Sequence, residues 1–296
     1  MAGEHADVVL LSGDIGNKLF DNLKKVDARR FYNCGVAEAN MMGVAAGLAL
    51  SGLRPFVYTI TPFTTTRCFE QIRVDAAYHN VPVVIVGTGS GLSYADLGPT
   101  HHSLEDLAIL RTLPNMRVLA PCDSIELRLA LRAVLKEDGP VYIRIGKKGE
   151  PAIHASEPDF RIGRGIVVRP GTEVGLVAAG TIMPEVLGAA DRLAALGVSA
   201  EVVSFHSIKP LDTAYLDDAC GRFTLLATVE EHGCIGGLGS AVAEHLAPRR
   251  AAPPQLLFGS ADEFMHEVGT QEYARRKFGL TAENISATVL QALRNR

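Results

Sequence analysis

Short runs of β-branched and other apolar residues alternate with longer segments rich in alanine and leucine along the chain. Residues 8–11 (Val-Val-Leu-Leu) and 81–86 (Val-Pro-Val-Val-Ile-Val) have the length of strands, whereas residues 38–50 and 185–196 have the length and composition of helices. Such alternation is typical of βαβ units, in which a helix connects two parallel strands. The sequence therefore predicts an α/β protein with mainly parallel sheets.

The alternation is interrupted once, and this interruption predicts two domains. Residues 146–164 are charged and contain several glycines and prolines, as is typical of a linker. The pattern of strand and helix resumes at residues 174–178. We therefore expect two consecutive α/β domains, at residues 1–150 and 165–296, joined by a linker at residues 151–164.

Composition and charge exclude several classes of function. The formal net charge of −4 over 296 residues gives no electrostatic basis for binding nucleic acid or an anionic membrane surface. No apolar run reaches the roughly 18 residues of a membrane-spanning helix, and residues 1–7 lack the basic and apolar segments of a signal peptide. The five cysteines are scattered, without Cys-x-x-Cys spacing. We expect a cytoplasmic protein with reduced thiols and with no metal site in this chain.

Several short motifs follow one another from the first half of the chain into the second. Residues 31–41 place Glu38 in a segment of small residues, and residues 98–101 read Gly-Pro-Thr-His. The further motifs are Leu-Pro-Asn-Met at 113–116, Ala-Pro-Cys-Asp at 120–123, Asp-Gly-Pro-Val-Tyr-Ile-Arg at 138–144, Ile-Lys-Pro-Leu-Asp at 208–212, Glu-Glu-His-Gly at 230–233 and Gly-Gly-Leu-Gly-Ser at 236–240. Together they resemble the transketolase family, and in particular the C-terminal, β-type subunits of split transketolases.

The resemblance implies a pyrimidine-binding domain followed by a transketolase C-terminal domain, with thiamine diphosphate as the cofactor. It also implies transfer of a two-carbon ketol unit between sugars, sugar phosphates or related carbonyl compounds. The family's diphosphate-binding domain carries a Gly-Asp-Gly motif with a following Asn, and no such segment occurs in this sequence. The resemblance therefore implies a separate partner subunit that holds Mg²⁺ and the cofactor's diphosphate, an α2β2 assembly, and self-association of this chain.

Four residues match family positions near the pyrimidine ring of the cofactor. Glu38 matches the glutamate that hydrogen-bonds this ring and activates the cofactor, so the resemblance implies a catalytic role. Phe63 matches an aromatic residue that stacks on the ring, and Ile60 stands where the family usually has a further aromatic residue. Asp14 matches an acid near the cofactor, and a loop-capping aspartate is an equally good interpretation.

Three further residues match substrate-binding positions of the family. His101 matches a histidine that contacts the reacting oxygens, where a neutral imidazole is suited to moving protons. Lys147 stands where the family tends to have a phosphate-gripping arginine, and a solvated linker charge is the alternative. Leu97 replaces an acid that recognises a sugar hydroxyl, with Asp96 one place upstream, and Gly89 replaces a histidine. We therefore expect an unusual substrate, which is shorter, deoxygenated or unphosphorylated.

Two other functions stay open from the sequence. The β-subunits of 2-oxoacid dehydrogenases and deoxyxylulose-phosphate synthase share this pair of domains and decarboxylate a 2-oxoacid, although the Gly-Pro-Thr-His loop favours a transketolase. A non-catalytic scaffold chain that retained the fold is the second alternative. The presence of both Glu38 and His101 argues against such a scaffold.

Overall fold

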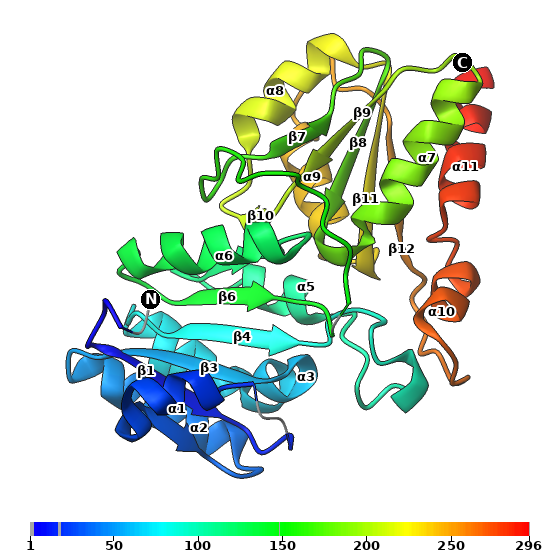
Figure 1. Ribbon diagram of the computed structural model, residues 1–296. Coiled ribbons are helices and arrows are strands. Elements are labelled where there is room, and N and C mark those ends of the chain that lie inside the picture. The colour runs from blue at the N-terminus through cyan, green and yellow to red at the C-terminus, as the bar shows by residue number, and fades with distance from the viewer. Residues whose placement is uncertain (1–2, 17–18, 148, 296) are drawn as a thin grey trace.

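The computed structural model describes residues 3–16, 19–147 and 149–295. Two α/β parts lie one above the other, with the N-terminal part below and the C-terminal part above (Figure 1). Within the described residues, the lower part is built on a seven-stranded sheet in the order β10-β5-β6-β4-β3-β1-β2. Its strands are β1 (Val8–Ser12), β2 (Phe31–Asn33), β3 (Arg54–Ile60), β4 (Val84–Thr88), β5 (Arg117–Leu119), β6 (Val141–Arg144) and β10 (Ser207–Lys209).

Helices cover both faces of this first sheet. One face, which includes Leu11 and Val57, packs in one buried cluster against α2, α5 and the π-helix Ile72–Tyr78. The other face, which includes Leu10 and Phe56, packs against α1 and α6. The α-helices of this part are α1 (Asp21–Asp27), α2 (Glu38–Leu50), α3 (Thr61–Thr64), α4 (Phe69–Gln71), α5 (Asp106–Arg111) and α6 (Ser124–Ala133). The small residues of α2 form the helix that its composition predicts, and it ends before Gly52.

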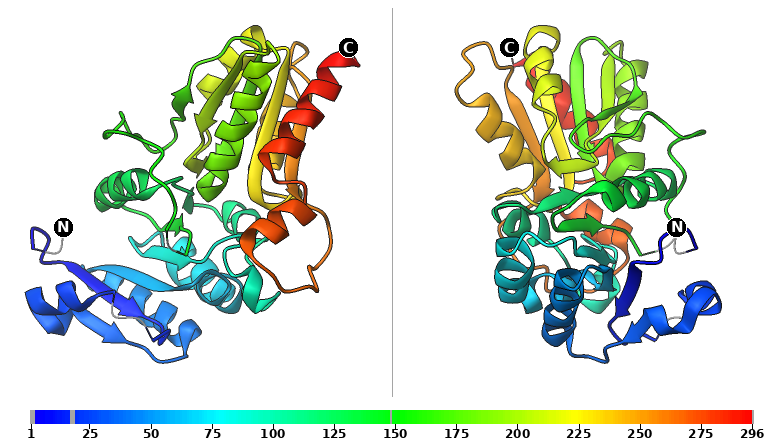
Figure 2. Two further views of the ribbon diagram at one scale, coloured as in Figure 1. Left: turned by 45° about the vertical axis from the view of Figure 1, so that its right-hand side comes forward. Right: turned by 90° about the vertical axis from the view of Figure 1, so that its left-hand side faces the viewer.

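The upper part is a second sheet with helices on both faces, as the two views of Figure 2 show. Within the described residues its order is β12-β11-β8-β9-β7, and only the edge strand β7 is antiparallel to its neighbour. Its strands are β7 (Ile166–Arg169), β8 (Val174–Ala179), β9 (Ala200–Ser204), β11 (Leu225–Gly233) and β12 (Gln255–Ser260). Its helices are α7 (Met183–Ala195), α8 (Thr213–Arg222), α9 (Leu238–Leu246), α10 (Gln271–Lys277) and α11 (Ala282–Arg294). These observations confirm the α/β class with mainly parallel sheets.

Strand β10 ties the two parts together. It lies beyond β9 in the chain, yet it pairs antiparallel with β5 at the edge of the first sheet. The Nζ of Lys209 at its end donates to the carbonyl of Arg111 at 3.0 Å. A buried apolar cluster also runs from the first sheet to β9 and α8 of the second part. The sequence did not predict β10, because three residues are too few to show an alternation.

The buried strand predicted at residues 81–86 begins later than expected. Strand β4 starts at Val84 and continues to Thr88. Pro82 has no N–H to donate to a neighbouring strand, and ladder pairing begins only after it, where the carbonyl of Val83 accepts the N–H of Val141 in β6 at 3.0 Å.

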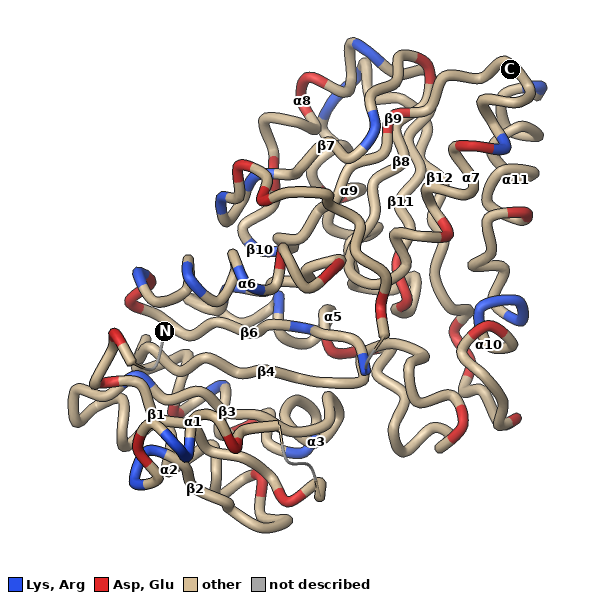
Figure 3. The backbone as a smooth tube through the Cα atoms, in the orientation of Figure 1, with Lys and Arg blue, Asp and Glu red and all other residues tan. Residues whose placement is uncertain are grey.

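The described part of the chain contains no helix with both the length and the apolar character that crossing a bilayer requires. Acidic and basic residues are interspersed over both parts of the chain, in keeping with the small formal charge of −4 (Figure 3).

Candidate active site

The parallel strands of the first sheet end at one edge, and this edge carries the predicted cofactor residues. Glu38 is the first residue of α2, which follows the short turn after β2, and its side chain is only 3% exposed. Ile60 is the last residue of β3 and is buried, and Phe63 lies in α3, which follows directly. Glu38 and Phe63 therefore come from two strand-to-helix connections that follow one another along the chain, after β2 and after β3.

Asp14 lies in the loop after β1 and has an exposed side chain. Its backbone N–H donates to the carbonyl of Gly35 at 2.8 Å, which places it next to the turn that precedes Glu38. Its carboxylate accepts the N–H of Gly16 at 3.4 Å. These contacts are those of a loop-capping aspartate, and a contact with a cofactor stays a prediction.

Arg67 connects Glu38 to Phe63. Its Nη1 donates to Oε2 of Glu38 at 2.8 Å, and its guanidinium carbon lies 4.2 Å from the centre of the Phe63 ring. The structure gives Glu38 no other hydrogen-bond partner among the described residues, so one oxygen of its carboxylate stays available. Sequence reasoning missed Arg67, because it lies 29 residues after Glu38 with no motif around it.

His101 joins this group from the loop that carries the Gly-Pro-Thr-His motif. Its ring centre lies 5.3 Å from that of Phe63 and 5.8 Å from that of Tyr94, both in edge-on contacts. Its Nδ1 shares a hydrogen bond of 2.9 Å with the hydroxyl of Thr100. Desolvation, together with the positive charge of Arg67, lowers the pKa of His101, although the Asp96 carboxylate opposes this shift. The imidazole is therefore neutral at pH 7.

Lys147 follows the end of β6 and lies over the ring of Tyr94, which contacts His101. Its Nζ lies 4.4 Å from the centre of the Tyr94 ring and 3.7 Å from Oδ1 of Asp96. The side chain is one-third exposed, so it is neither buried nor fully solvated. Leu97, next to Asp96, is 48% exposed on the same loop. Of the predicted residues, the structure thus brings Glu38, Phe63, His101 and Lys147 into one chain of contacts, through Arg67 and Tyr94, which were not predicted.

A buried ion pair holds the loop of His101 in place. Arg144 is 3% exposed and donates through Nε to Oδ2 of Asp106 at 2.9 Å. Its Nη2 donates to the carbonyl of Ser103 in the loop at 2.9 Å and to that of Glu231 in the second sheet at 2.6 Å. The Tyr142 hydroxyl donates to the same Asp106 oxygen at 2.6 Å. Asp106 and Arg144 therefore couple the site loop to the contact between the two sheets.

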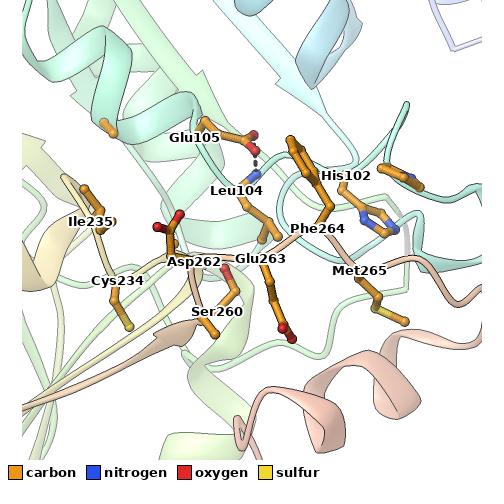
Figure 4. Close-up of a pocket in the computed structure, with 14 residues that line it drawn as sticks. His102, Leu104, Glu105, Cys234, Ile235, Ser260, Asp262, Glu263, Phe264 and Met265 are labelled. Atoms are coloured by element: carbon orange, nitrogen blue, oxygen red, sulfur yellow. Dashed lines mark hydrogen bonds between the residues drawn. The ribbon is translucent and has the colours of Figure 1, made fainter.

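A cavity of about 370 Å³ lies on the other side of this loop, between the loop and the ends of β11 and β12. Figure 4 shows His102 and the side chains of Glu105, Asp262, Glu263 and Phe264 around it. Its lining does not include Glu38, Phe63 or His101, so the cavity is separate from the predicted site.

One group of side chains in the described residues has the composition of a metal site, namely Cys122, Asp123 and His154. The Asp123 carboxylate caps α6 through the N–H groups of Ile125 and Glu126. The imidazole of His154 pairs with Glu126 at 2.9 Å. These side chains already have partners in the fold, and the group lies where Ile153 donates to Asp123 and where Ser204 of β9 donates to Glu126 of α6.

Comparisons with known proteins show the family to which both parts of the chain belong. Residues 1–150 match the family model described as transketolase, pyrimidine binding domain, and residues 163–285 match that described as transketolase, C-terminal domain. A 6-deoxy-6-sulfo-D-fructose transketolase subunit, SqwH, from Clostridium sp. (strain MSTE9) is 40% identical over 256 residues, which cover 86% of this chain and 79% of the relative.

Two further similarities extend over nearly the whole chain. An apulose-4-phosphate transketolase subunit from Phocaeicola vulgatus is 33% identical over 293 residues, which cover 98% of this chain and 93% of that relative. A solved structure described as a split gene transketolase, inactive beta4 tetramer, is 37% identical and has a TM-score of 0.87. The match covers 98% of this chain and 93% of that chain.

Proposed function

The chain belongs to the transketolase family, as the β-type subunit of a split enzyme, and from this premise we propose that Glu38 activates thiamine diphosphate bound between this chain and a partner subunit. Split transketolases transfer ketol groups and work with a separate partner. The observation that supports this proposal is the Glu38 carboxylate, which is 3% exposed and accepts a hydrogen bond from Arg67. The same Arg67 lies over the ring of Phe63, and Phe63 in turn contacts His101.

The residues present fit the pyrimidine end of the cofactor. One oxygen of Glu38 accepts from Arg67, which leaves the other free to share a proton with a ring nitrogen. Phe63, whose ring contacts the guanidinium of the same Arg67, supplies an aromatic surface on which the pyrimidine could stack. Bound thiamine diphosphate supplies the carbanion chemistry that takes up and releases a two-carbon unit.

The other site residues have roles toward the substrate in this proposal. The neutral imidazole of His101 moves a proton to or from the substrate oxygen at the reacting carbon. Lys147 binds an anionic or hydroxyl-bearing end of the substrate as a point charge. Leu97 and Ile60 supply apolar walls on the substrate and cofactor sides, and Asp14 shapes the loop next to the pyrimidine.

We propose that the partner subunit holds the diphosphate and Mg²⁺ and that two copies of each chain form an α2β2 assembly. The described chain offers a face for self-association on α2 and the turn before it. Val36, Val44 and Leu50 are 79%, 44% and 63% exposed there, in a segment without charged residues after Glu38. Exposed apolar side chains on a helix of small residues are typical of a surface that packs against another chain.

The proposed substrate is a ketose that differs from the ordinary phosphorylated ones. The sulfosugar and the apulose phosphate named for the two relatives are candidate donors or products. Leu97 and Gly89, where an acid and a histidine are expected, support a site that makes fewer contacts to hydroxyl and phosphate groups. A 2-oxoacid decarboxylation is not favoured, because relatives that match over most of both chains are transketolase subunits.

Thiamine diphosphate is expected to bind tightly only to a mixture of this chain and its partner, because this chain carries residues for the pyrimidine end alone. Calorimetry with thiamine diphosphate and Mg²⁺ measures this for the chain, for the partner and for the mixture. Equal affinity of the isolated chain would contradict the shared site, and the absence of binding in the mixture would favour the scaffold alternative.

As the pH is lowered, the rate of ketol transfer is expected to fall only below about pH 6.5, which is the ordinary pKa of histidine. The pKa of His101 is lowered by desolvation and by Arg67, so its neutral, proton-accepting form persists below that pH. The dependence of kcat/KM on pH for the reconstituted enzyme measures this. His101→Asn is expected to abolish this acidic limb along with most of the activity, and an unchanged limb would assign the titration to another group.

A further inference from the structure

The ring of Tyr94 occupies the space that a side chain at position 89 would need. Gly89 follows β4 directly and has a φ of +73°, a conformation that favours glycine. A Cβ at this position would lie 1.9 Å from Cε2 and 2.2 Å from Cδ2 of the Tyr94 ring. A side chain at position 89 and the present position of Tyr94 are therefore mutually exclusive.

Tyr94 stands between the two residues proposed to act on the substrate. Its ring is 5.8 Å from that of His101 and 4.4 Å from the ammonium of Lys147. The ammonium is also 3.7 Å from the carboxylate of Asp96. The aromatic face and the carboxylate together hold Lys147 next to His101.

The charged side chains near His101 and Tyr94 form pairs of opposite sign, so their charges cancel. Glu38 is paired with Arg67, Lys147 is paired with Asp96, and His101 is neutral at pH 7. A doubly charged phosphate would meet one ammonium that is already paired, and it would also lie near the Asp96 carboxylate. A singly charged or uncharged group meets less repulsion there, because the Coulomb energy scales with the charge of the ligand.

We propose that Tyr94, whose ring packs against Gly89, is a specificity-determining residue that acts with Lys147 and Asp96. Together they form a subsite for the terminal group of the sugar and select a sulfonate, a carboxylate or an uncharged group over a dianionic phosphate. The inference rests on the proposed function, since it concerns the substrate of that same site.

A matched pair of donors tests this selectivity. D-Fructose 6-phosphate and 6-deoxy-6-sulfo-D-fructose have the same carbon chain and differ in the terminal group, which is a doubly charged phosphate ester in the first and a singly charged sulfonate bonded directly to C6 in the second. D-Glyceraldehyde serves as an uncharged acceptor for both. The complex of this chain with its partner is expected to prefer the sulfonate by about tenfold or more in kcat/KM. Equal kcat/KM for the two donors, or a preference for the phosphate, would overturn the inference.

Three variants test which residues set the preference. Asp96→Asn removes one negative charge and leaves the ammonium of Lys147 without its counter-charge, so it is expected to shift the ratio toward the phosphate by about tenfold. Tyr94→Leu is expected to shift it in the same direction, because it releases Lys147 and opens space above Gly89. Tyr78→Leu is the control, since Tyr78 is 80% exposed in the π-helix and its ring contacts that of His79, and its ratio is expected to match the wild type.

The contact between Tyr94 and Gly89 has its own test. Gly89→Ala is expected to lower kcat/KM by about tenfold in the wild-type background, because the new Cβ displaces the ring. In the Tyr94→Leu background the same change is expected to cost clearly less. Equal losses in both backgrounds would show that the effect arises from the backbone at position 89 and would contradict the role of the ring.

The failure of this inference and that of the proposed function give different results. If thiamine diphosphate does not bind to the mixed subunits, the proposed function fails. If it binds and the enzyme transfers ketol groups, but the ratio changes by less than about twofold in the Asp96 and Tyr94 variants, only the subsite is wrong. Cofactor binding without transfer from either donor would contradict a subsite that accepts a sulfonate, since both terminal groups would then be rejected.

Discussion

Replacing Glu38 by glutamine is expected to reduce ketol transfer by the complex of this chain and its partner about 10²- to 10⁴-fold. The glutamine keeps the shape of the side chain and an oxygen that can accept from Arg67. It cannot share an ionisable proton with the pyrimidine ring, so the cofactor would bind without being activated. Steady-state kcat at saturating thiamine diphosphate measures the loss, and calorimetry shows whether the cofactor still binds.

Glu70→Gln is a matched control for this change. Glu70 also pairs with an arginine, since Nη1 of Arg73 lies 3.3 Å from its carboxylate, but it is 66% exposed and lies outside the site. The control is expected to keep the wild-type rate. If Glu38→Gln retained more than about a tenth of that rate, the carboxylate would not be the activating group, and the scaffold alternative would gain support.

Replacing Asp106 by alanine is expected to lower the free energy of unfolding by about 3–5 kcal/mol. Asp106 and Arg144 are 1% and 3% exposed, so the change leaves a guanidinium buried without its counter-charge. It also removes the acceptor of the Tyr142 hydroxyl. The shift in the urea unfolding midpoint of the full chain, at unchanged slope, measures the loss.

An exposed ion pair provides the comparison. Asp159 pairs with Arg161 at 3.3 Å, and the two side chains are 64% and 66% exposed. Asp159→Ala is expected to cost less than about 1 kcal/mol. If Asp106→Ala does not yield folded protein, Asp106→Asn replaces it, because asparagine keeps an oxygen that can accept from Arg144 and Tyr142. Asp106→Asn is expected to lower the free energy of unfolding by more than Asp159→Ala does. If the Asp106 variants lost no more than Asp159→Ala, the structural role of the buried pair would be contradicted.

The sequence was informative about the site wherever a residue is tied to a short motif. Glu38 and His101 belong to motifs whose position on a strand-to-helix connection and on a loop follows from the local pattern. The structure places them near Phe63 at one edge of the first sheet, as parallel strands require. The roles of these residues in catalysis stay predictions.

Arg67 and Tyr94 were missed for a physical reason. Neither has a pattern of its own, and each matters through a neighbour that lies far along the chain. Arg67 contacts Glu38, which lies 29 residues earlier in the chain. Tyr94 lies in the loop after β4, and it contacts Lys147, which lies after β6. The sequence contained one signal that could have found Tyr94: the glycine at position 89 leaves a space that some nearby side chain must fill.

By itself the sequence determined the α/β class, the parallel sheets and the membership of a two-domain family, because these depend on hydrophobic periodicity and on local motifs. The tertiary structure alone decided that β10 crosses to the first sheet, that Arg144 joins the site loop to Glu231, and that the charges at the site are paired. Such contacts depend on the paths of loops and on the packing of one element against another. Residues far apart in the chain carry no local pattern that records which of them will meet.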